Sequence, residues 1–310
     1  MQGITPTSDP IIILRSTLRQ EYPEIDEIYT DDYLANVLSQ SSSEGINCSS
    51  SLDGGNDDNY IGIATKKIRE SLQWRRDVNV DLLTSAAVVC DDYVNEGVFR
   101  PTTTSSSTAV AAAAAAAAAG DDVIPPTTTE LVNICQSGAF RFVGFDNKGK
   151  AILHARASLL NWRKINVDDG IKYHILVIEH ALKAMAMRND NVKKKEANDG
   201  VTPPPPPSAN NDIGISESMI LYIDTSNMGL LPPPLAALTG LAMLMQTAYP
   251  YRFERAYVGP VNILLRGLNK AVSVFLTAGS RQKITMMKDV PSNETVGELE
   301  EGNAQSTLTS

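Results

Sequence analysis

The sequence is poor in cysteine, with Cys48, Cys90 and Cys135 spread over 310 positions. An odd number of widely spaced cysteines does not build a disulfide framework, and no CxxC pair is present to hold a metal. We therefore expect a reducing compartment such as the cytoplasm, with no metal and no bound cofactor.

Positive charge is also scarce. Lys and Arg number 27 against 36 Asp and Glu, which gives a formal net charge of −9. A protein that binds a nucleic-acid backbone usually carries a basic excess, because neutralising phosphates supplies most of the affinity. We therefore expect no nucleic-acid partner.

Long uninterrupted hydrophobic runs are missing as well. The early apolar run 11–14 is too short for a signal peptide and has no basic segment before it. The long uncharged stretch 230–251 contains four prolines, which disfavour a membrane-spanning helix. These features predict a protein that meets membranes only peripherally, from the water side.

Three low-complexity segments interrupt the chain. Residues 39–59 are rich in Ser, Gly, Asn and Asp; residues 101–129 combine Thr and Ser runs with nine alanines; residues 189–216 contain three lysines and five prolines in succession. None can bury enough apolar side chain to offset the entropy of ordering it, so all three are interpreted as disordered, solvated insertions. The polar segment 291–310 is interpreted as a disordered tail.

The rest of the chain alternates between two hydrophobic periods. Helical spacing predicts helices over 31–38, 60–77, 171–187, 235–246 and 262–276. Short apolar runs predict strands over 140–145, 151–156, 219–223, 256–259 and 284–287, and the first two are joined by the turn 146–149. Such an alternation is typical of an α/β fold with a mixed, mainly parallel sheet. The run 235–246 is apolar nearly all round, which predicts an internal helix.

The predicted helix 262–276 carries an apolar stripe on one side and Arg266 and Lys270 on the other. At ~1.5 Å per residue it would be about 22 Å long, comparable to a lipid acyl chain. Periodicity alone fits either ordinary core packing or a wall of a ligand pocket.

Five segments, in order, carry a family resemblance. They read LQWRR (72–76), SGAF with GFDNKGK (137–150), MILYID (219–224), YPYRFERAYV (249–258) and RQKI (281–284). Together they resemble the CRAL-TRIO lipid-binding domain, the family of phosphatidylinositol-transfer and tocopherol- or retinaldehyde-binding proteins. The resemblance implies a sheet whose helices enclose an apolar lipid pocket, preceded by a small helical region, and a carrier rather than an enzyme.

Two departures from the family pattern bear on the ligand. Tyr251 and Arg255 occupy the places where phosphoinositide binders of the family carry Glu and Lys. The aromatic segment that opens the long helix in the family is aliphatic here, at residues 260–265. The resemblance therefore implies a lipid, phospholipid or otherwise, without naming it.

The resulting organisation is a helical region over 11–100 with the insertion 39–59, the insertion 101–129, a CRAL-TRIO-like domain over 130–290 with the insertion 189–216, and the tail 291–310. The candidate lipid-binding residues come from one strand, two helical segments and the motif at 249–258. They are Met219, Leu221, Ile223, Leu241, Leu244, Tyr249, Tyr251, Arg255, Tyr257, Leu264, Leu268, Val272 and Phe275.

Three functions fit these patterns. The first is binding of one hydrophobic ligand, and its transfer between membranes, in a pocket gated by the helix 262–276, with Arg255 and Tyr251 contacting a polar head. The second is a non-transferring lipid sensor or partner-docking module. The third is a cysteine-dependent phosphatase using Cys135 and Arg141 in a C-x-x-G-x-x-R loop, which would need a strand over 131–134 and a helix opening at the arginine.

Overall fold

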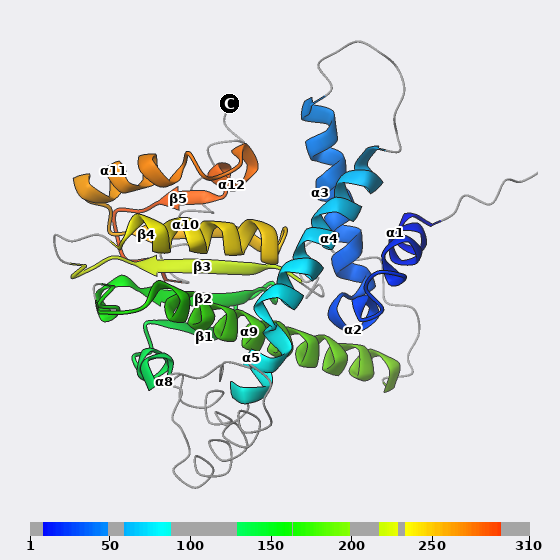
Figure 1. The fold of residues 1–310 in the computed structure, drawn as a ribbon, viewed down its shortest axis with the longest axis horizontal. Helices are drawn as coiled ribbons and strands as arrows, with labels where there is room; N and C mark the ends of the chain where they lie inside the picture. The colour runs from blue at the N-terminus through cyan, green and yellow to red at the C-terminus, as the bar shows by residue number, and fades with distance from the viewer. Residues whose placement is uncertain are drawn as a thin grey trace, which may run out of the picture. The chain divides into compact units, whose positions relative to one another are not determined.

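A computed structural model describes residues 9–48, 59–87, 129–162, 164–198, 217–228 and 233–292. The chain divides into two compact units (Figure 1). Unit 1 comprises Met1–Asn79 together with Leu244–Arg252, and unit 2 comprises Val80–Met243 together with Phe253–Ser310. Among the described helices, none has both the length and the hydropathy needed to cross a bilayer.

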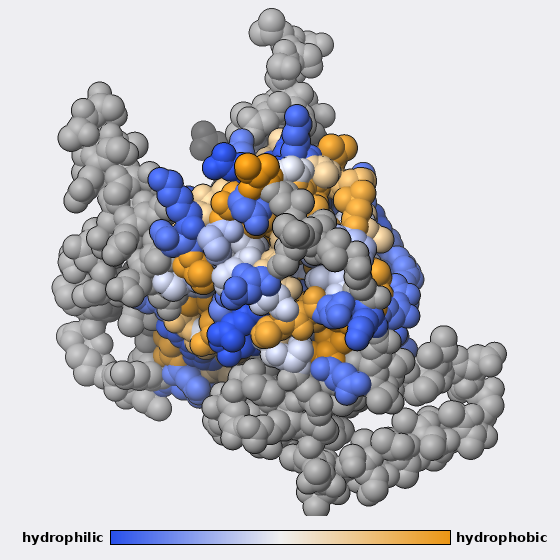
Figure 2. Space-filling model, turned by 90° about the vertical axis from the view of Figure 1, so that its left-hand side faces the viewer, coloured by the Kyte–Doolittle hydropathy of each residue, from blue (hydrophilic) through white to orange (hydrophobic). Residues whose placement is uncertain are grey.

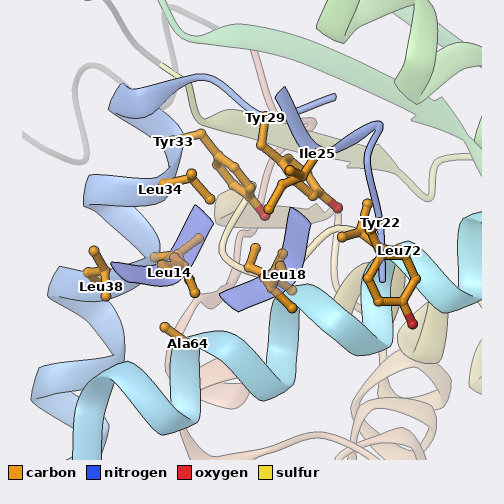
Figure 3. Close-up of a cluster of buried hydrophobic side chains, with 12 residues drawn as sticks. Leu14, Leu18, Tyr22, Ile25, Tyr29, Tyr33, Leu34, Leu38, Ala64 and Leu72 are labelled. Atoms are coloured by element: carbon orange, nitrogen blue, oxygen red, sulfur yellow. The ribbon is translucent and has the colours of Figure 1, made fainter. Parts of the chain in front are cut away.

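Unit 1 is helical, with α1 (Pro10–Arg19), α2 (Ile25–Ile28), α3 (Asp31–Cys48) and α4 (Asn59–Val78). Its core is a cluster of aliphatic and tyrosine side chains that point inward from α1, α3 and α4 (Figure 3). The fully covered members include Leu14, Leu18, Ile25, Tyr33, Leu34, Ile68 and Leu72.

The segment Leu244–Arg252 completes unit 1, although it lies far along the chain from α1–α4. It opens with a π-helical turn, Leu244–Ala248. The Tyr33 hydroxyl donates a 2.6 Å hydrogen bond to the Pro250 carbonyl, and the Ser71 hydroxyl donates to the Ala248 carbonyl. These bonds tie the segment to α3 and α4, because both donors are buried side chains of those helices.

Unit 2 is built on a five-stranded sheet in the order β1-β2-β3-β4-β5. The strands are β1 (Phe140–Phe145), β2 (Ala151–Arg156), β3 (Met219–Asp224), β4 (Phe253–Gly259) and β5 (Ile284–Met286). β1 is antiparallel to β2, and every other pair is parallel. This confirms the predicted α/β class with a mixed, mainly parallel sheet after a helical region.

The β1–β2 hairpin closes as its sequence predicts. The Asp146 carboxylate accepts hydrogen bonds from the backbone N–H groups of Lys148 and Lys150, an Asx-type turn. Gly149 has a φ of +83°, and a Cβ there would lie 3.2 Å from the Arg188 guanidinium, so glycine suits the position on both counts.

Helices of unit 2 are α5 (Val80–Ala87), α8 (Thr129–Gln136), α9 (Val167–Asn198), α10 (Leu235–Met243), α11 (Ile263–Val272) and α12 (Ala278–Gln282), with a short 3₁₀ turn at Ala157–Leu159. α9 packs against β1 and β2, and α10 packs against α9 and α11. A helix that connects two parallel strands of one sheet almost always makes a right-handed crossover. The parallel strands β2 to β5 follow one another in order across the sheet, so the helices that connect them, α9, α10 and α11, lie over the same face.

Several helix boundaries differ from the prediction. α3 continues through Cys48 and α9 through Asn198, so residues 39–48 and 189–198 are helical rather than disordered insertions. The buried side chains Ser41 and Asn189 explain the difference, since tertiary packing outweighs a polar composition. The low-complexity residues 49–58, 101–128 and 199–216 and the tail residues 293–310 lie outside the described residues.

Two apolar helices also differ. α10 is not internal throughout, because Leu235 is 49% and Met243 55% exposed. α11 has ten residues, so its length is about 15 Å rather than about 22 Å. Turn hydrogen bonds from Phe275 to Val272 and from Leu276 to Ser273 follow the helix, and Thr277 then caps the separate helix α12 by accepting the Ser280 N–H.

Candidate functional site

The register of the strands aligns apolar side chains in rows on the face of the sheet that α9 covers. Facing residues on neighbouring strands share a side of the sheet, and alternate residues along a strand do too. The first row is Phe140, Ala155, Ile223, Val258 and Met286. The second row is Phe142, Leu153, Leu221, Ala256 and Ile284.

Some side chains of these rows are buried and others, including Phe142 and Ala155 near the β1 edge, are half-buried. Beneath α9, Phe140 and Leu153 are buried, and the Phe140 ring stacks on His174 of α9 at 4.5 Å between ring centres. Towards β5 the side chains are equally apolar, and five of them are half-buried, whereas Leu221 of β3 is buried. We call these five residues, Ile223, Ala256, Val258, Ile284 and Met286, the apolar floor.

α11 follows β4 and precedes β5, so it lies on the same face as the apolar floor. Its first turn is capped by Asn262, whose side chain accepts the Leu265 N–H at 2.9 Å. Leu265 is buried, while Leu268 and Val272, three and seven residues further, are half-buried. These side chains form one stripe at helical spacing.

The outer side of the α11 region is apolar too. Ile263 is 90%, Val274 78% and Phe275 47% exposed, and the exposed cations Arg266 and Lys270 stand beside them. An exposed apolar stripe flanked by basic residues is typical of helices that lie in a membrane interface.

The structure brings part of the predicted site together. Met219, Leu221 and Ile223 of β3 project on the α9-covered side, and half-buried Leu241 belongs to α10. The Leu264 side chain lies outside the described residues. Leu268, Val272 and Phe275 belong to α11 and the turn after it.

Other predicted residues lie elsewhere. Leu244, Tyr249 and Tyr251 belong to unit 1. Tyr257 projects from the opposite face of the sheet and is fully buried there in a cluster with Ile152, Ile220, Tyr222 and Met287. Arg255 is exposed and has the same strand parity as Tyr257.

Tyr251 is held by contacts within unit 1. The Lys67 ammonium group donates a 2.6 Å hydrogen bond to its hydroxyl and stands 4.2 Å from its ring centre. Its backbone has a φ of +60°, an uncommon conformation for a residue with a side chain.

Val258, Ile284 and Met286 of the floor were absent from the sequence-based site. The alternation along β4 indicated that Val258 and Tyr257 face opposite sides. Which of them shares a side with Leu221 depends on inter-strand register, and one sequence does not contain that information.

A concavity lies at the edge where β3 and β4 end. Figure 2 shows hydrophobic and charged residues interspersed over one face of the molecule. The volume of the concavity is about 280 Å³, slightly below the ~300–1,000 Å³ usual for small-molecule sites. Its lining is Thr225, Ser226, Asn227, Met228, Pro260, Val261 and Asn262.

The phosphatase geometry is not formed. Residues 131–134, expected as a strand in that hypothesis, belong to helix α8, and Cys135 is buried near the end of that helix. Arg141 lies in a strand rather than at a helix start, so no helix dipole faces a thiolate. In the described ranges, no three His, Cys, Asp or Glu side chains converge as metal ligands.

His174 is a packing residue, as its position on an apolar helix face predicts. Its Nδ1 lies 2.7 Å from the Gly170 carbonyl oxygen. Burial lowers the pKa of His174 to about 4, against a weaker opposing effect of that hydrogen bond. The neutral ring is therefore the stable form between Phe140 and Trp162 near pH 7.

Comparison with known proteins gives a match over the part of the chain that contains the sheet and α11. The family model of the CRAL/TRIO domain matches residues 136–301. Among solved structures, the crystal structure of Sfh5 is similar at 16% identity and a TM-score of 0.45, covering 86% of this chain and 69% of Sfh5. No curated protein matches the sequence.

Proposed function

The chain belongs to the CRAL/TRIO domain family, and from this membership we propose that it holds one hydrophobic, lipid-like molecule between the apolar floor and α11. Proteins of this family are in general lipid-binding carriers rather than enzymes. The proposal adds the place of the ligand and the role of the helix.

The half-buried state of the apolar floor carries the proposal. Val258, Ile284 and Met286 keep part of their surface accessible on the face of the sheet that carries α11, and Leu268 and Val272 of α11 are half-buried too. Apolar surface left open to water costs roughly 25 cal/mol per Å². A hydrophobic ligand in this place would remove that cost, which no polar ligand could do.

Energetics favour a dry enclosure over a charged one. Lifting a lipid out of a bilayer forfeits roughly 0.8 kcal/mol for each methylene that water would otherwise touch. Two acyl chains with ~30 methylenes thus put more than ~20 kcal/mol at stake. Walls from Leu221, Ile223 and Leu241 would keep the ligand dry.

α11 would act as the gate of this pocket. Its inner stripe would cover the ligand in the closed state, and its outer residues Ile263 and Val274 would enter the membrane interface during exchange. Arg266 and Lys270, both exposed, would then meet anionic lipid heads.

The remaining predicted residues have smaller parts in the proposal or none. Tyr249 and Tyr251 belong to unit 1 and Arg255 lies on the opposite face of the sheet, so the proposal gives these three residues no contact with the ligand. Met219 and Leu244 are buried and would act through packing. Phe275, in the turn after α11, would close the pocket entrance.

A vesicle-to-vesicle exchange assay, combined with native mass spectrometry of the purified chain, tests the proposal. Leu268→Asp should abolish co-purified lipid and exchange, because a carboxylate would enter the apolar enclosure. Ile263→Asp, on the outer side of the same helix, should retain bound lipid but exchange it more slowly, by about tenfold.

Circular dichroism should show both variants folded. Lipid uptake by Leu268→Asp equal to that of the unmodified protein would overturn the gate and the position of the pocket. Lipid bound without any exchange would instead identify a sensor, and it would overturn only the transfer step.

A further inference from the structure

We propose that Arg141 and His154 form a binding site for a phosphate group on the face of the sheet opposite to α9. Arg141 of β1 and His154 of β2 are direct cross-strand partners. Directly opposed residues on neighbouring strands carry their Cβ atoms ~4.5–5.5 Å apart on the same face, so both side chains can contact one ligand. This site is independent of the apolar floor, which lies on the other face.

Both side chains present a hydrogen-bonding nitrogen that no group of the described residues satisfies. Arg141 Nε and His154 Nε2 are buried, and neither has a hydrogen-bond partner within the part of the chain that the structure describes. Buried polar atoms in folded proteins are nearly always paired, and one acceptor group placed between these two opposed residues would serve both nitrogens. An anion accepts strongly from a guanidinium N–H, and it also favours the imidazole form that donates from Nε2.

The local charge also favours an anion. Besides burial, the nearby charges of Arg141 and Arg156 lower the pKa of His154, and Asp224 opposes them. Arg156 ends β2 and faces Asp224 across the sheet, at the same end where Arg141 begins β1. Two arginines against one carboxylate leave an uncompensated positive charge around the imidazole.

Three donor side chains suit a phosphate better than a carboxylate. Arg141, His154 and the exposed Arg156 approach from two strands, and a phosphate presents three or more oxygens to them. The cluster stands at the carboxyl ends of β2 and β3, the edge at which open α/β sheets bind ligands. The chemistry is shared by free phosphate and by the head group of an anionic phospholipid.

The histidines give a direct readout, because the chain has only His154, His174 and His180. NMR of their ring signals in the full chain should show His154 shifting on titration with inorganic phosphate, and its pKa rising, because an anion favours the protonated imidazole. His174 and His180 should stay unmoved and report that the fold is intact. His154→Gln assigns the signal.

The source of the phosphate follows from a second titration with vesicles. Phosphatidylcholine vesicles serve as the neutral control for vesicles that contain phosphatidic acid. A His154 shift with inorganic phosphate identifies a free phosphate ligand, whereas a shift only with phosphatidic acid identifies a lipid head group. Both outcomes support the site, and no shift with either probe overturns it.

Arg141→Gln should weaken phosphate binding about tenfold, which is the usual loss in affinity for one charge-assisted hydrogen bond. Arg141→Lys should lose less, because it keeps the charge. Lys148→Gln removes an exposed cation from the hairpin at the other end of the same strands, so it should leave the titration unchanged. Equal affinities of Arg141→Gln and Lys148→Gln would overturn the assignment, while lipid uptake through α11 should be unaffected in both.

Discussion

The buried side chain of His174 makes the stability of unit 2 depend on pH in the acid range. Its pKa is about 4 in the folded chain against 6.5 for an ordinary histidine, because burial disfavours the charged ring. Between these values the unfolded chain binds the extra proton and the folded chain does not. Stability is therefore complete above pH 6.5 and falls as the pH drops towards 4.

The expected loss is about 2 kcal/mol between pH 7 and pH 5. Replacing His174 with Asn should lower stability at pH 7 through lost packing against Phe140. The same change should flatten the pH dependence, because the titrating ring is gone. Urea unfolding at both pH values measures the pH dependence of the free energy of unfolding. An equally steep dependence in the variant would exclude His174 as the source of that pH dependence.

At the scale of elements, α11 depends on its first turn. Asn262 caps that turn by accepting the Leu265 N–H, and Asn→Ala changes at such positions cost ~1 kcal/mol. Asn262→Ala should therefore speed amide hydrogen exchange in α11 by about fivefold, with little change in β3 or β4. Asn262→Asp, which keeps the acceptor, should exchange like the unmodified chain; uniform acceleration across unit 2 would contradict a local effect.

Element types followed from sequence more readily than element lengths. The hairpin of β1 and β2 has the predicted bounds, because Asp146 and Gly149 fix its turn locally. β3 was evident as an apolar run ending in Asp224. α3 and α9 run longer than predicted, because tertiary burial of Ser41 and Asn189 overrides the local preference of polar segments.

The candidate site was only partly accessible from sequence for a related reason. Helical spacing within α11 identified Leu268 and Val272, since both lie on one element. The pairing of Val258 and Met286 with Ile223 is a property of register between strands that are distant in sequence. Tyr257 has the hydrophobicity of a pocket residue, and only its strand parity places it on the other face.

At the scale of the whole molecule, the net charge of −9 opposes approach to an anionic membrane. The Debye length is ~30 Å at 0.01 M salt and ~8 Å at 0.15 M. Moderate salt should therefore screen the overall repulsion while leaving the apolar contact of Ile263 and Val274 intact. Vesicle flotation should show stronger binding to anionic vesicles at 0.15 M than at 0.01 M salt, and the reverse order would indicate that Arg266 and Lys270 dominate.

The dependence of unit 1 on Leu244–Arg252 has a consequence for synthesis on the ribosome. Helices α1–α4 leave the exit tunnel early, but the carbonyl groups that receive the Tyr33 and Ser71 hydroxyls are made only when translation passes residue 250. The nascent amino-terminal helices must wait with part of their contact surface uncovered while most of the β-strands emerge. A stop codon before Pro250 would thus deprive the first unit of its last piece, even though every residue of α1–α4 had been translated.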